Sequence, residues 1–123
     1  MIEGTLDKST NLIKMSYSGR VDPEQTQAYV PRMQAMLAEV QPGFRLLTDL
    51  RRLETMDLGC VPFIEQVMDL CDDRGISMVV RIIPDPHKDI GLNIMSLFHY
   101  RRGVRIVTCL TMEQAETALA NRG

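Results

Sequence analysis

The chain has 123 residues, of which 45% are hydrophobic, and this length suits one compact domain over residues 1–123 with no room for a second. Its 14 basic and 16 acidic residues are mixed along the sequence, and the formal net charge of -2 excludes a global field that attracts nucleic acid or an anionic membrane. No window approaches the roughly 20 apolar residues that span a bilayer, and residues 1–4 lack the features of a secretory signal. We therefore expect a cytoplasmic protein that binds no nucleic acid and has no membrane span.

Two short β-type runs stand at the amino end, over residues 2–8 and 12–17, with turn-prone residues between them. This pattern predicts a β-hairpin. A helix is predicted next, because Asp22 is a typical N-cap, Pro23 occupies the first helical position, and Gln25 stands where a capping-box partner reaches back. Pro31 projects to the side of this helix opposite its apolar stripe, where water can satisfy the freed carbonyl. The stripe consists of Tyr29, Val30, Met33, Met36, Leu37 and Val40.

Residues 44–50 and 76–83 predict two further strands. The second is almost continuously apolar, with Arg81 as its main break, and such runs are typical of parallel strands covered on both faces. Between them, residues 57–74 predict a long amphipathic helix that Gly75 closes as a C-terminal cap. Strand, helix and strand form one right-handed crossover unit.

Residues 86–101 predict another helix, residues 104–108 a short last strand, and residues 111–121 a final helix. The last helix opens with Thr111-Met112-Glu113-Gln114, which is a capping box. The fold class that follows is α/β, with an N-terminal hairpin feeding a mixed, mainly parallel central sheet and about four helices.

One run in the middle of the chain is more specific than the rest: an apolar strand, Leu46-Leu47-Thr48-Asp49-Leu50, ends in Asp-Leu, and a second aspartate, Asp57, follows Asp49 by eight residues. Shorter phrases stand before the first helix, after the second and at the start of the last: Ser18-Gly19-Arg20-Val21-Asp22, Arg74-Gly75 and Glu113-Gln114-Ala115. In this order, over nearly the full chain, they resemble the STAS domain of bacterial anti-sigma-factor antagonists and related regulators. The resemblance implies a STAS-like fold.

In the resembled family, the second aspartate is typically followed by two hydroxyl residues and a glycine, and a kinase partner phosphorylates one hydroxyl to switch binding off. Here Leu58, Gly59 and Cys60 follow Asp57, and neither leucine nor glycine has an oxygen that accepts a phosphoryl group. The resemblance therefore implies a non-enzymatic regulatory protein-protein interaction module without the usual phosphoswitch. Its expected partner is a regulatory protein of the anti-sigma-factor or kinase-like kind, and a homodimer remains open.

The resemblance also implies that the partner docks at the start of the helix over residues 57–74. One half of that helix is acidic, and an acidic stripe would steer a basic partner, although a solvated outer face explains it equally. Asp57 likewise needs no role beyond that of an N-cap. The candidate partner-binding residues are Met56, Asp57, Leu58, Gly59, Cys60, Val61, Pro62, Glu65 and Asp69.

An alternative function is the binding of a small ligand such as a nucleotide, an anion or a lipid. Arg51 and Arg52 follow one strand and Arg81 lies near the end of the next, so a parallel sheet brings them toward its carboxyl edge, where small ligands often bind. Surface salt bridges and an Arg81 that lays its stem on apolar surface are the plainer interpretation. A secondary interface at Met95 and Phe98 is a further hypothesis, since both lie off the apolar stripe of their helix.

The sequence contains few features that indicate catalysis or metal binding. Asp49 and Asp57 have no nucleophile or orienting base beside them, so no catalytic residue and no cofactor are predicted. His87 and His99 have no companion at metal-ligand spacing. The odd number of cysteines, three, favours free, buried thiols rather than a disulfide framework.

Overall fold

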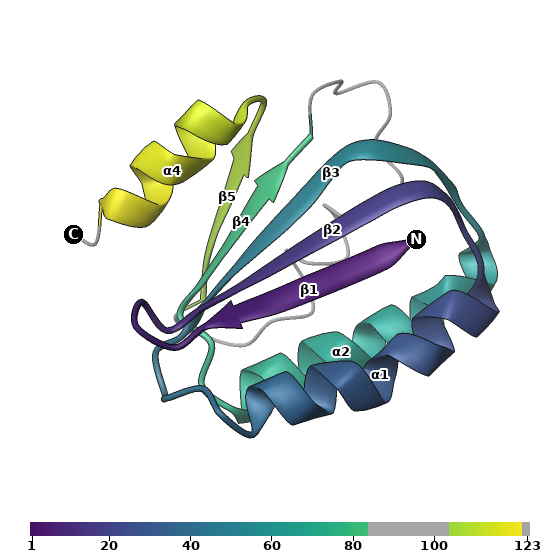
Figure 1. Cartoon of the computed structure of the whole chain (residues 1–123), viewed down its shortest axis with the longest axis horizontal. Helices are drawn as coiled ribbons and strands as arrows, with labels where there is room; N and C mark the ends of the chain where they lie inside the picture. The colour runs from purple at the N-terminus through teal and green to yellow at the C-terminus, as the bar shows by residue number, and fades with distance from the viewer. Residues whose placement is uncertain (84–103, 122–123) are drawn as a thin grey trace.

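The computed structural model describes residues 1–83 and 104–121, and Figure 1 shows their arrangement. The described strands are β1 (Ile2–Asp7), β2 (Leu12–Val21), β3 (Arg45–Met56), β4 (Met78–Ile82) and β5 (Arg105–Cys109). The described helices are α1 (Pro23–Leu37), α2 (Val61–Asp73) and α4 (Met112–Ala120), with a 3-10 turn, η1 (Leu58–Cys60), directly before α2. The sequence predicts about four helices, and within these residues the count is three, because the predicted helix over residues 86–101 lies outside them.

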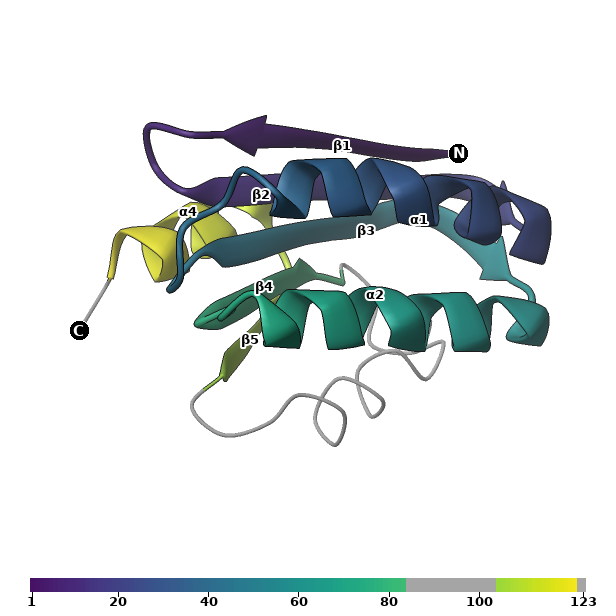
Figure 2. The ribbon, with the colours of Figure 1, turned by 90° about the horizontal axis from the view of Figure 1, so that it is seen from below.

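The strands form one sheet in the order β1-β2-β3-β4-β5. β1 and β2 pair antiparallel, and the remaining neighbours in this described sheet pair in parallel. Parallel neighbours need a crossover connection, which α1 supplies between β2 and β3 and α2 supplies between β3 and β4. Figures 1 and 2 show α1 and α2 side by side on one face of the sheet and α4 on the other. The mixed, mainly parallel sheet that begins with a hairpin is thus confirmed.

Hydrophobic side chains pack on both faces of the sheet. The cluster beneath α1 and α2 is the larger one and includes the fully buried Ile13, Met33, Phe44, Cys60 and Cys71. The cluster beneath α4 is smaller and consists of Leu12, Leu47, Met78, Val80, Ile82, Cys109, Ala115 and Leu119. Because β4 contributes to both clusters, all five of its residues are buried. This confirms that the apolar run is a strand covered on both faces.

The predicted helix starts are present, with one difference in each capping box. Asp22 accepts a hydrogen bond from the Gln25 backbone N–H at 2.8 Å, and the Thr111 hydroxyl accepts one from the Gln114 N–H at 3.1 Å. Neither reciprocal bond is made: the Gln25 side chain donates to the Arg20 carbonyl at 3.4 Å, and the Gln114 side chain accepts from the Leu110 N–H at 2.8 Å instead of from the N–H of Thr111. Each box therefore satisfies orphan donors of the first turn without the full reciprocal pair.

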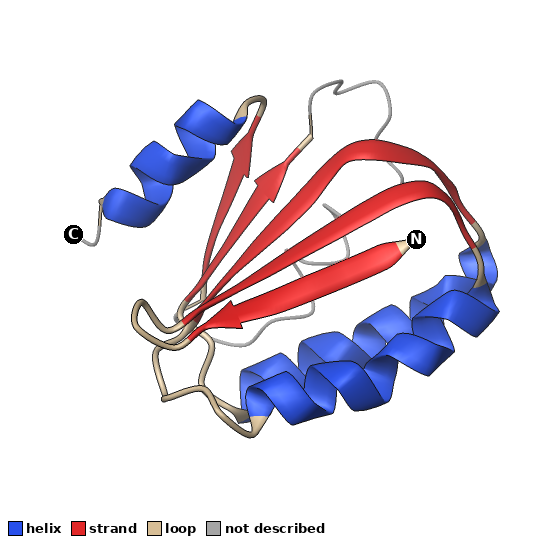
Figure 3. Ribbon diagram, viewed as in Figure 1, coloured by secondary structure: helices blue, strands red, loops and turns tan. Residues whose placement is uncertain are grey.

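β2 and β3 are longer than their apolar patterns predict. The predicted strands stop at Tyr17 and Leu50, whereas β2 continues to Val21 and β3 to Met56. Their pairing shifts register twice beyond Ser16, and shifts of this kind bend the paired strands. Figure 3 shows both strands curving over toward their carboxyl ends. The curve carries the end of β3 to the start of η1.

The helix predicted over residues 57–74 is divided. It begins as η1, and the α-helix proper starts at Val61. Pro62 lies in the first turn, where a backbone N–H has no acceptor within the helix, so the proline removes no helix hydrogen bond. Gly75 follows the helix with φ at 86°, a left-handed conformation that favours glycine. The Gly75 N–H donates to the Asp72 carbonyl at 3.1 Å, as expected of a C-terminal cap.

Candidate functional site

The turn η1 is held by hydrogen bonds that converge on Asp57. Its carboxylate accepts from the Gly59 N–H at 2.7 Å, and its carbonyl accepts from the Cys60 N–H at 2.9 Å. The Asp57 N–H donates to the carbonyl of Val21 at 3.1 Å, which ties the turn to the end of β2. Asp57 therefore acts as the N-cap that the plainer interpretation assigns to it, here for the 3-10 turn.

Gly59 lets this turn pack against the start of α1. A Cβ atom at Gly59 would lie 2.7 Å from the Cγ of Pro23 and 3.2 Å from an Asp57 carboxylate oxygen, so a larger residue would displace the turn. Pro23 is not among the residues that the sequence predicts for this site. No local pattern reveals it, because the contact joins segments that only the parallel pairing of β2 and β3 brings together.

Leu58 is held out on this capped turn with 82% of its surface exposed. The other large hydrophobic residues that stand out among the described ones are Met1 at 62% and Leu110 at 47%. Leu58 is thus an exposed apolar side chain on a backbone that hydrogen bonds already fix, so contact there would require little further ordering of the backbone.

Exposed residues of α2 continue the surface that Leu58 begins. Pro62, Glu65 and Asp69 stand at positions i, i+3 and i+7 of the helix, so they share one face, and all three are exposed. We call Leu58, Pro62, Glu65 and Asp69 the docking ridge. The acidic half of the helix also presents Gln66 and Asp73 to solvent, with Asp72 half-buried, while Ile64, Met68 and Cys71 are buried on the other side.

Cys60, one of the predicted partner-binding residues, has no accessible side-chain surface. Its side chain is fully buried, and its thiol lies 3.6 Å from the carbonyl of Val21. Burial raises the pKa of this thiol, with smaller contributions from the nearby carboxylates of Asp57 and Asp22. Met56 and Val61 are half-buried beside it, so the accessible part of the candidate set is narrower than predicted. The prediction of buried, free thiols holds for Cys60, Cys71 and Cys109.

The three arginines of the alternative ligand site do not come together. Arg51 makes a bidentate pair with Asp49, at 2.9 Å and 2.8 Å, and lines a hollow of about 300 Å³ together with Arg52. Arg81 is only 3% exposed and lies on the opposite face of the sheet under α2, where its guanidinium donates to the Thr108 hydroxyl at 3.3 Å. Side chains alternate between faces along a strand, and the bulged end of β3 adds a further offset. Arg81 therefore neither snorkels nor belongs to a site with Arg51.

The remaining predictions concern metals, membranes and the secondary interface. Within residues 1–83 and 104–121, no group of three or more histidine, cysteine, aspartate or glutamate side chains could hold a metal ion. In the same part of the chain, no helix is long and apolar enough to cross a bilayer. Met95, Phe98, His87 and His99 lie outside the described residues.

No protein-family model matches the chain, and a search of curated proteins finds no significant match. Solved structures do match, and they define the class: the chain has the SpoIIAA-like α/β fold of anti-sigma-factor antagonist (STAS) domains. The STAS-like fold inferred from the sequence is thereby confirmed.

The matching structures cover nearly the full chain at low identity. A Shewanella loihica protein of the DUF3478 family, with a SpoIIAA-like fold, has a TM-score of 0.75 at 14% identity, over 96% of this chain and 93% of that one. The anti-sigma factor antagonist SpoIIAA in its unphosphorylated form has a TM-score of 0.65 at 14% identity, over 98% and 99%. A STAS domain protein from Planctomyces limnophilus has a TM-score of 0.65 at 14% identity, over 98% of each chain. Identities this low establish a shared fold.

Proposed function

We propose that this protein is a non-enzymatic, cytoplasmic regulatory module that binds a protein partner through the docking ridge. The observation that carries the proposal is Leu58, which is 82% exposed on a turn that Asp57 caps. An apolar side chain presented on a fixed backbone gains by burial against a partner, and the backbone beneath it needs little further ordering. The fold, which is shared with proteins described as anti-sigma-factor antagonists, supports a partner of the anti-sigma-factor or kinase-like class.

The anchor is tested by substituting Leu58. The partner is first isolated from the native cell by affinity purification and identified by mass spectrometry, and its affinity is then measured by titration calorimetry. Leu58→Asp should weaken binding by about tenfold or more, as expected for an interface anchor. Leu110→Asp is the matched control, since Leu110 is also exposed but lies in the turn between β5 and α4. Unchanged affinity of the Leu58 variant, or an equal loss in both variants, contradicts the proposal.

The acidic half of the docking ridge is tested separately. Glu65 and Asp69 are expected to speed encounter with a basic partner, so association should slow as salt rises. Glu65→Lys with Asp69→Lys should lower the association rate and flatten or reverse its salt dependence. The control is Glu113→Lys with Glu116→Lys on α4, which changes the net charge equally at a distant exposed surface. Identical association rates in the two double variants would remove the acidic face from the proposal.

We further propose that phosphorylation at the position usual in the STAS family does not control binding. Between Thr55 and Phe63 the chain has one hydroxyl, that of Thr55, which is exposed on β3 before the capped turn. Incubation with a kinase of the resembled regulatory class and ATP, followed by mass spectrometry, should leave this stretch unmodified. Phosphate on a residue between Thr55 and Phe63 overturns this part of the proposal.

The second candidate function is the binding of a small nucleotide, anion or lipid. The observation that favours it is the hollow of about 300 Å³ in which Arg51 and Arg52 lie beside Ser16 and Ser18. A ligand that binds the native state raises its apparent stability, so thermal-shift screening against these classes provides the test. Arg52→Gln should abolish any shift found, and the absence of a shift for every class excludes this candidate.

A further inference from the structure

The outer side of β1 is a backbone edge that no described strand covers. β1 is the first strand in the order β1-β2-β3-β4-β5, so within the described sheet it pairs on one side only. Figure 2 shows β1 at the border of this sheet, with α1 and α2 displaced toward the other strands. Natural edge strands are often protected by a proline, a lysine or a bulge, and β1 has none of these over Ile2–Asp7. The strand is therefore open to pairing with another chain.

The hydrogen bonds at the start of the hairpin show which backbone groups point outward. Met1 and Ser18 exchange two backbone hydrogen bonds, at 2.7 Å and 2.9 Å. Hydrogen-bonded and non-hydrogen-bonded pairs alternate along an antiparallel ladder, so every second residue from Met1 onward bonds to β2. The residues between them direct their N–H and C=O groups away from β2, to the open edge. These outward residues are Ile2, Gly4 and Leu6.

This edge is complementary to a second copy of itself. In an antiparallel pair centred on Gly4, Gly4 lies opposite Gly4 of the second copy, and Ile2 lies opposite its Leu6. Each outward residue then meets another outward residue, so all of them exchange hydrogen bonds. Opposed residues also lie on the same face of the joined sheet, so the helices of both copies lie on the same side. Registers displaced by two residues keep these matches but form fewer pairs.

The side chains agree with this register on both faces. On the helix side, Ile2 and Leu6 are half-buried and pack against the core cluster, so pairing would cover more of their apolar surface. On the other face, Glu3 lies opposite Thr5 of the second copy, and Lys14 is the register partner of that Thr5. Glu3 and Lys14 then lie about 10 Å apart at their Cα atoms, with only the short Thr5 between them. Within residues 2–6, no two like charges stand directly opposite each other.

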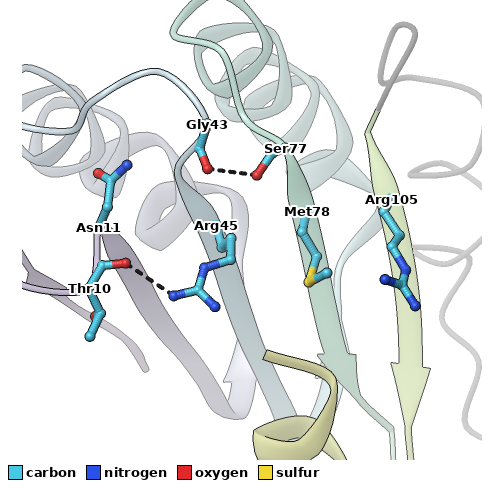
Figure 4. Close-up of a pocket in the computed structure, with 7 residues that line it drawn as sticks. All are labelled: Thr10, Asn11, Gly43, Arg45, Ser77, Met78 and Arg105. Carbon is cyan, nitrogen blue, oxygen red and sulfur yellow. Dashed lines mark hydrogen bonds between the residues drawn. The ribbon is translucent and has the colours of Figure 1, made fainter. Parts of the chain in front are cut away.

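The hairpin that carries β1 is fixed to the rest of the sheet at its turn. The Asn11 side chain donates to the Gln41 carbonyl at 3.1 Å and accepts from the Gln41 N–H at 3.0 Å. The Thr10 carbonyl accepts from the Arg45 guanidinium at 3.1 Å, as Figure 4 shows. An edge held in this way loses little further conformational entropy when it pairs.

We propose that this protein forms a symmetric homodimer in which the β1 strands of two copies pair antiparallel about Gly4. The result is one continuous sheet with a two-fold axis between the two strands, and two-fold symmetry is the commonest among homo-oligomers. In Figure 2, α1 lies between β1 and α2, so the part of the docking ridge on α2 lies away from the joined edge. The dimer is independent of the docking ridge, so either proposal can fail without the other.

Sedimentation equilibrium of the full chain tests the association. Pairing through one short strand buries less than the standard interface of about 1,600 Å², so we expect a monomer–dimer equilibrium in the micromolar range. A protein that stays monomeric at millimolar concentration, or that forms a larger open assembly, overturns the proposal. The first of these results would leave the edge for a strand of a different protein.

Two substitutions of the exposed Thr5 separate dimerisation from the folding of the monomer. Thr5→Glu places a carboxylate directly opposite Glu3 of the second copy, and the symmetry repeats this pair, so dimerisation should weaken by about tenfold or more. Thr5→Lys should instead tighten the dimer. Within the monomer the order is reversed, because Lys14 is the neighbour of Thr5 on β2.

This reversal is the control for misfolding. Urea denaturation of dilute, monomeric protein should show Thr5→Glu to be at least as stable as Thr5→Lys, although its dimer is the weaker one. Equal dimer affinities of the two variants, or dimer affinities that follow the stability of the monomer, contradict the assignment.

Engineered thiols test the register. Glu3 of one copy and Thr5 of the other form a non-hydrogen-bonded pair with Cα atoms about 4.5 Å apart, which a disulfide can span. A mixture of the single variants Glu3→Cys and Thr5→Cys should therefore form covalent heterodimers under mild oxidation. Either variant alone places its thiols on a diagonal of about 7–8 Å between Cα atoms and should cross-link far more slowly. No cross-linking in the mixture, or equal cross-linking of either variant alone, overturns the register.

Discussion

Gly4 in β1 lies directly beneath Tyr29 of α1, where a side chain has no space. A Cβ atom at Gly4 would overlap the phenol oxygen of Tyr29 and lie 3.1 Å from the terminal methyl of Met36. Tyr29 is only 7% exposed and its ring is rigid, so it cannot withdraw cheaply. Gly4→Ala should therefore lower the free energy of unfolding by about 1–3 kcal/mol, as overpacking does, measured by urea denaturation.

A double-mutant cycle tests the cause of that loss. In a Tyr29→Phe background the overlapping oxygen is absent, so Gly4→Ala should cost measurably less than it does in the wild type. An equal cost in both backgrounds would show that the effect arises from the strand backbone and not from Tyr29.

Asp49 and Arg51 make stability depend on pH. The hydrogen bond from the Arg51 side chain, aided by its backbone N–H and its charge, lowers the pKa of Asp49 despite partial burial. A lowered pKa stabilises the folded state above the unfolded-state pKa of about 3.9, and this contribution is lost as pH falls through the lower folded-state value. The side chains are 42% and 21% exposed, so screening limits the contribution to under about 1 kcal/mol.

The variant Arg51→Gln isolates this contribution. Its urea midpoint should lie below that of the wild type at neutral pH, and the difference should shrink as the pH is lowered past 4 and Asp49 becomes protonated. A difference that is constant or grows toward acid pH would contradict the assigned role of the pair.

Sequence reasoning at the residue scale succeeds where a periodic pattern governs burial. The stripe of α1 is an example, since Tyr29 and Met33 are buried and Pro31 is exposed as predicted. Cys60 received two incompatible predictions, a buried thiol and a partner contact, and its full burial favours the buried thiol. The burial of Arg81 could not be predicted, because it depends on which sheet face α2 covers.

Among the elements, α1 is unusual in continuing through a proline. Pro31 lies in the middle of the helix and cannot donate to the carbonyl four residues earlier, that of Gln27. Both positions are exposed, so water can reach that carbonyl, but the helix still lacks one hydrogen bond. Pro31→Ala should raise the free energy of unfolding by about 1–2 kcal/mol, because the interior cost of proline exceeds its benefit of restricting the unfolded chain.

The same substitution in α2 provides the control. Pro62 stands in the first turn, where its N–H would have no intrahelical acceptor, so Pro62→Ala should bring no comparable gain. Urea midpoints of the two variants give the comparison. A gain at Pro62 as large as that at Pro31 would show that the missing hydrogen bond of the helix interior is not the cause of the cost at Pro31.

The starts of α1 and α4 could be predicted because the capping residues that mark them are local in sequence. The lengths of the strands could not be predicted. Asp22 and Thr111 cap the helices that they were expected to cap. The extension of β3 to Met56 depends on register shifts against β2, which appear in no single segment. The same limitation applies to the candidate site, since the resemblance located Leu58 and Asp57 while the contact with Pro23 arises from pairing over a long distance.

At the scale of the whole molecule, the sheet links two hydrophobic clusters that otherwise share no helix. Val79 belongs to the cluster under α1 and α2, and the next residue, Val80, belongs to the cluster under α4. The two hydrophobic clusters therefore meet across one continuous sheet. Since loss of β4 would expose both clusters at once, we expect the described chain to unfold as one cooperative unit.

The three thiols report on this cooperativity from both sides of the sheet. Cys60 and Cys71 belong to the hydrophobic cluster beneath α1 and α2, whereas Cys109 belongs to the cluster beneath α4. Burial raises the pKa of each thiol, to about 12 for Cys71, so the native protein should react slowly with an alkylating reagent at mildly alkaline pH. In a urea titration with pulsed alkylation and peptide mass spectrometry, all three should become labelled at one midpoint that coincides with the far-ultraviolet circular dichroism. Labelling of Cys109 at a lower urea concentration than Cys60 and Cys71 would instead show that α4 and β5 unfold as a separate unit, before the part of the protein that carries the docking ridge.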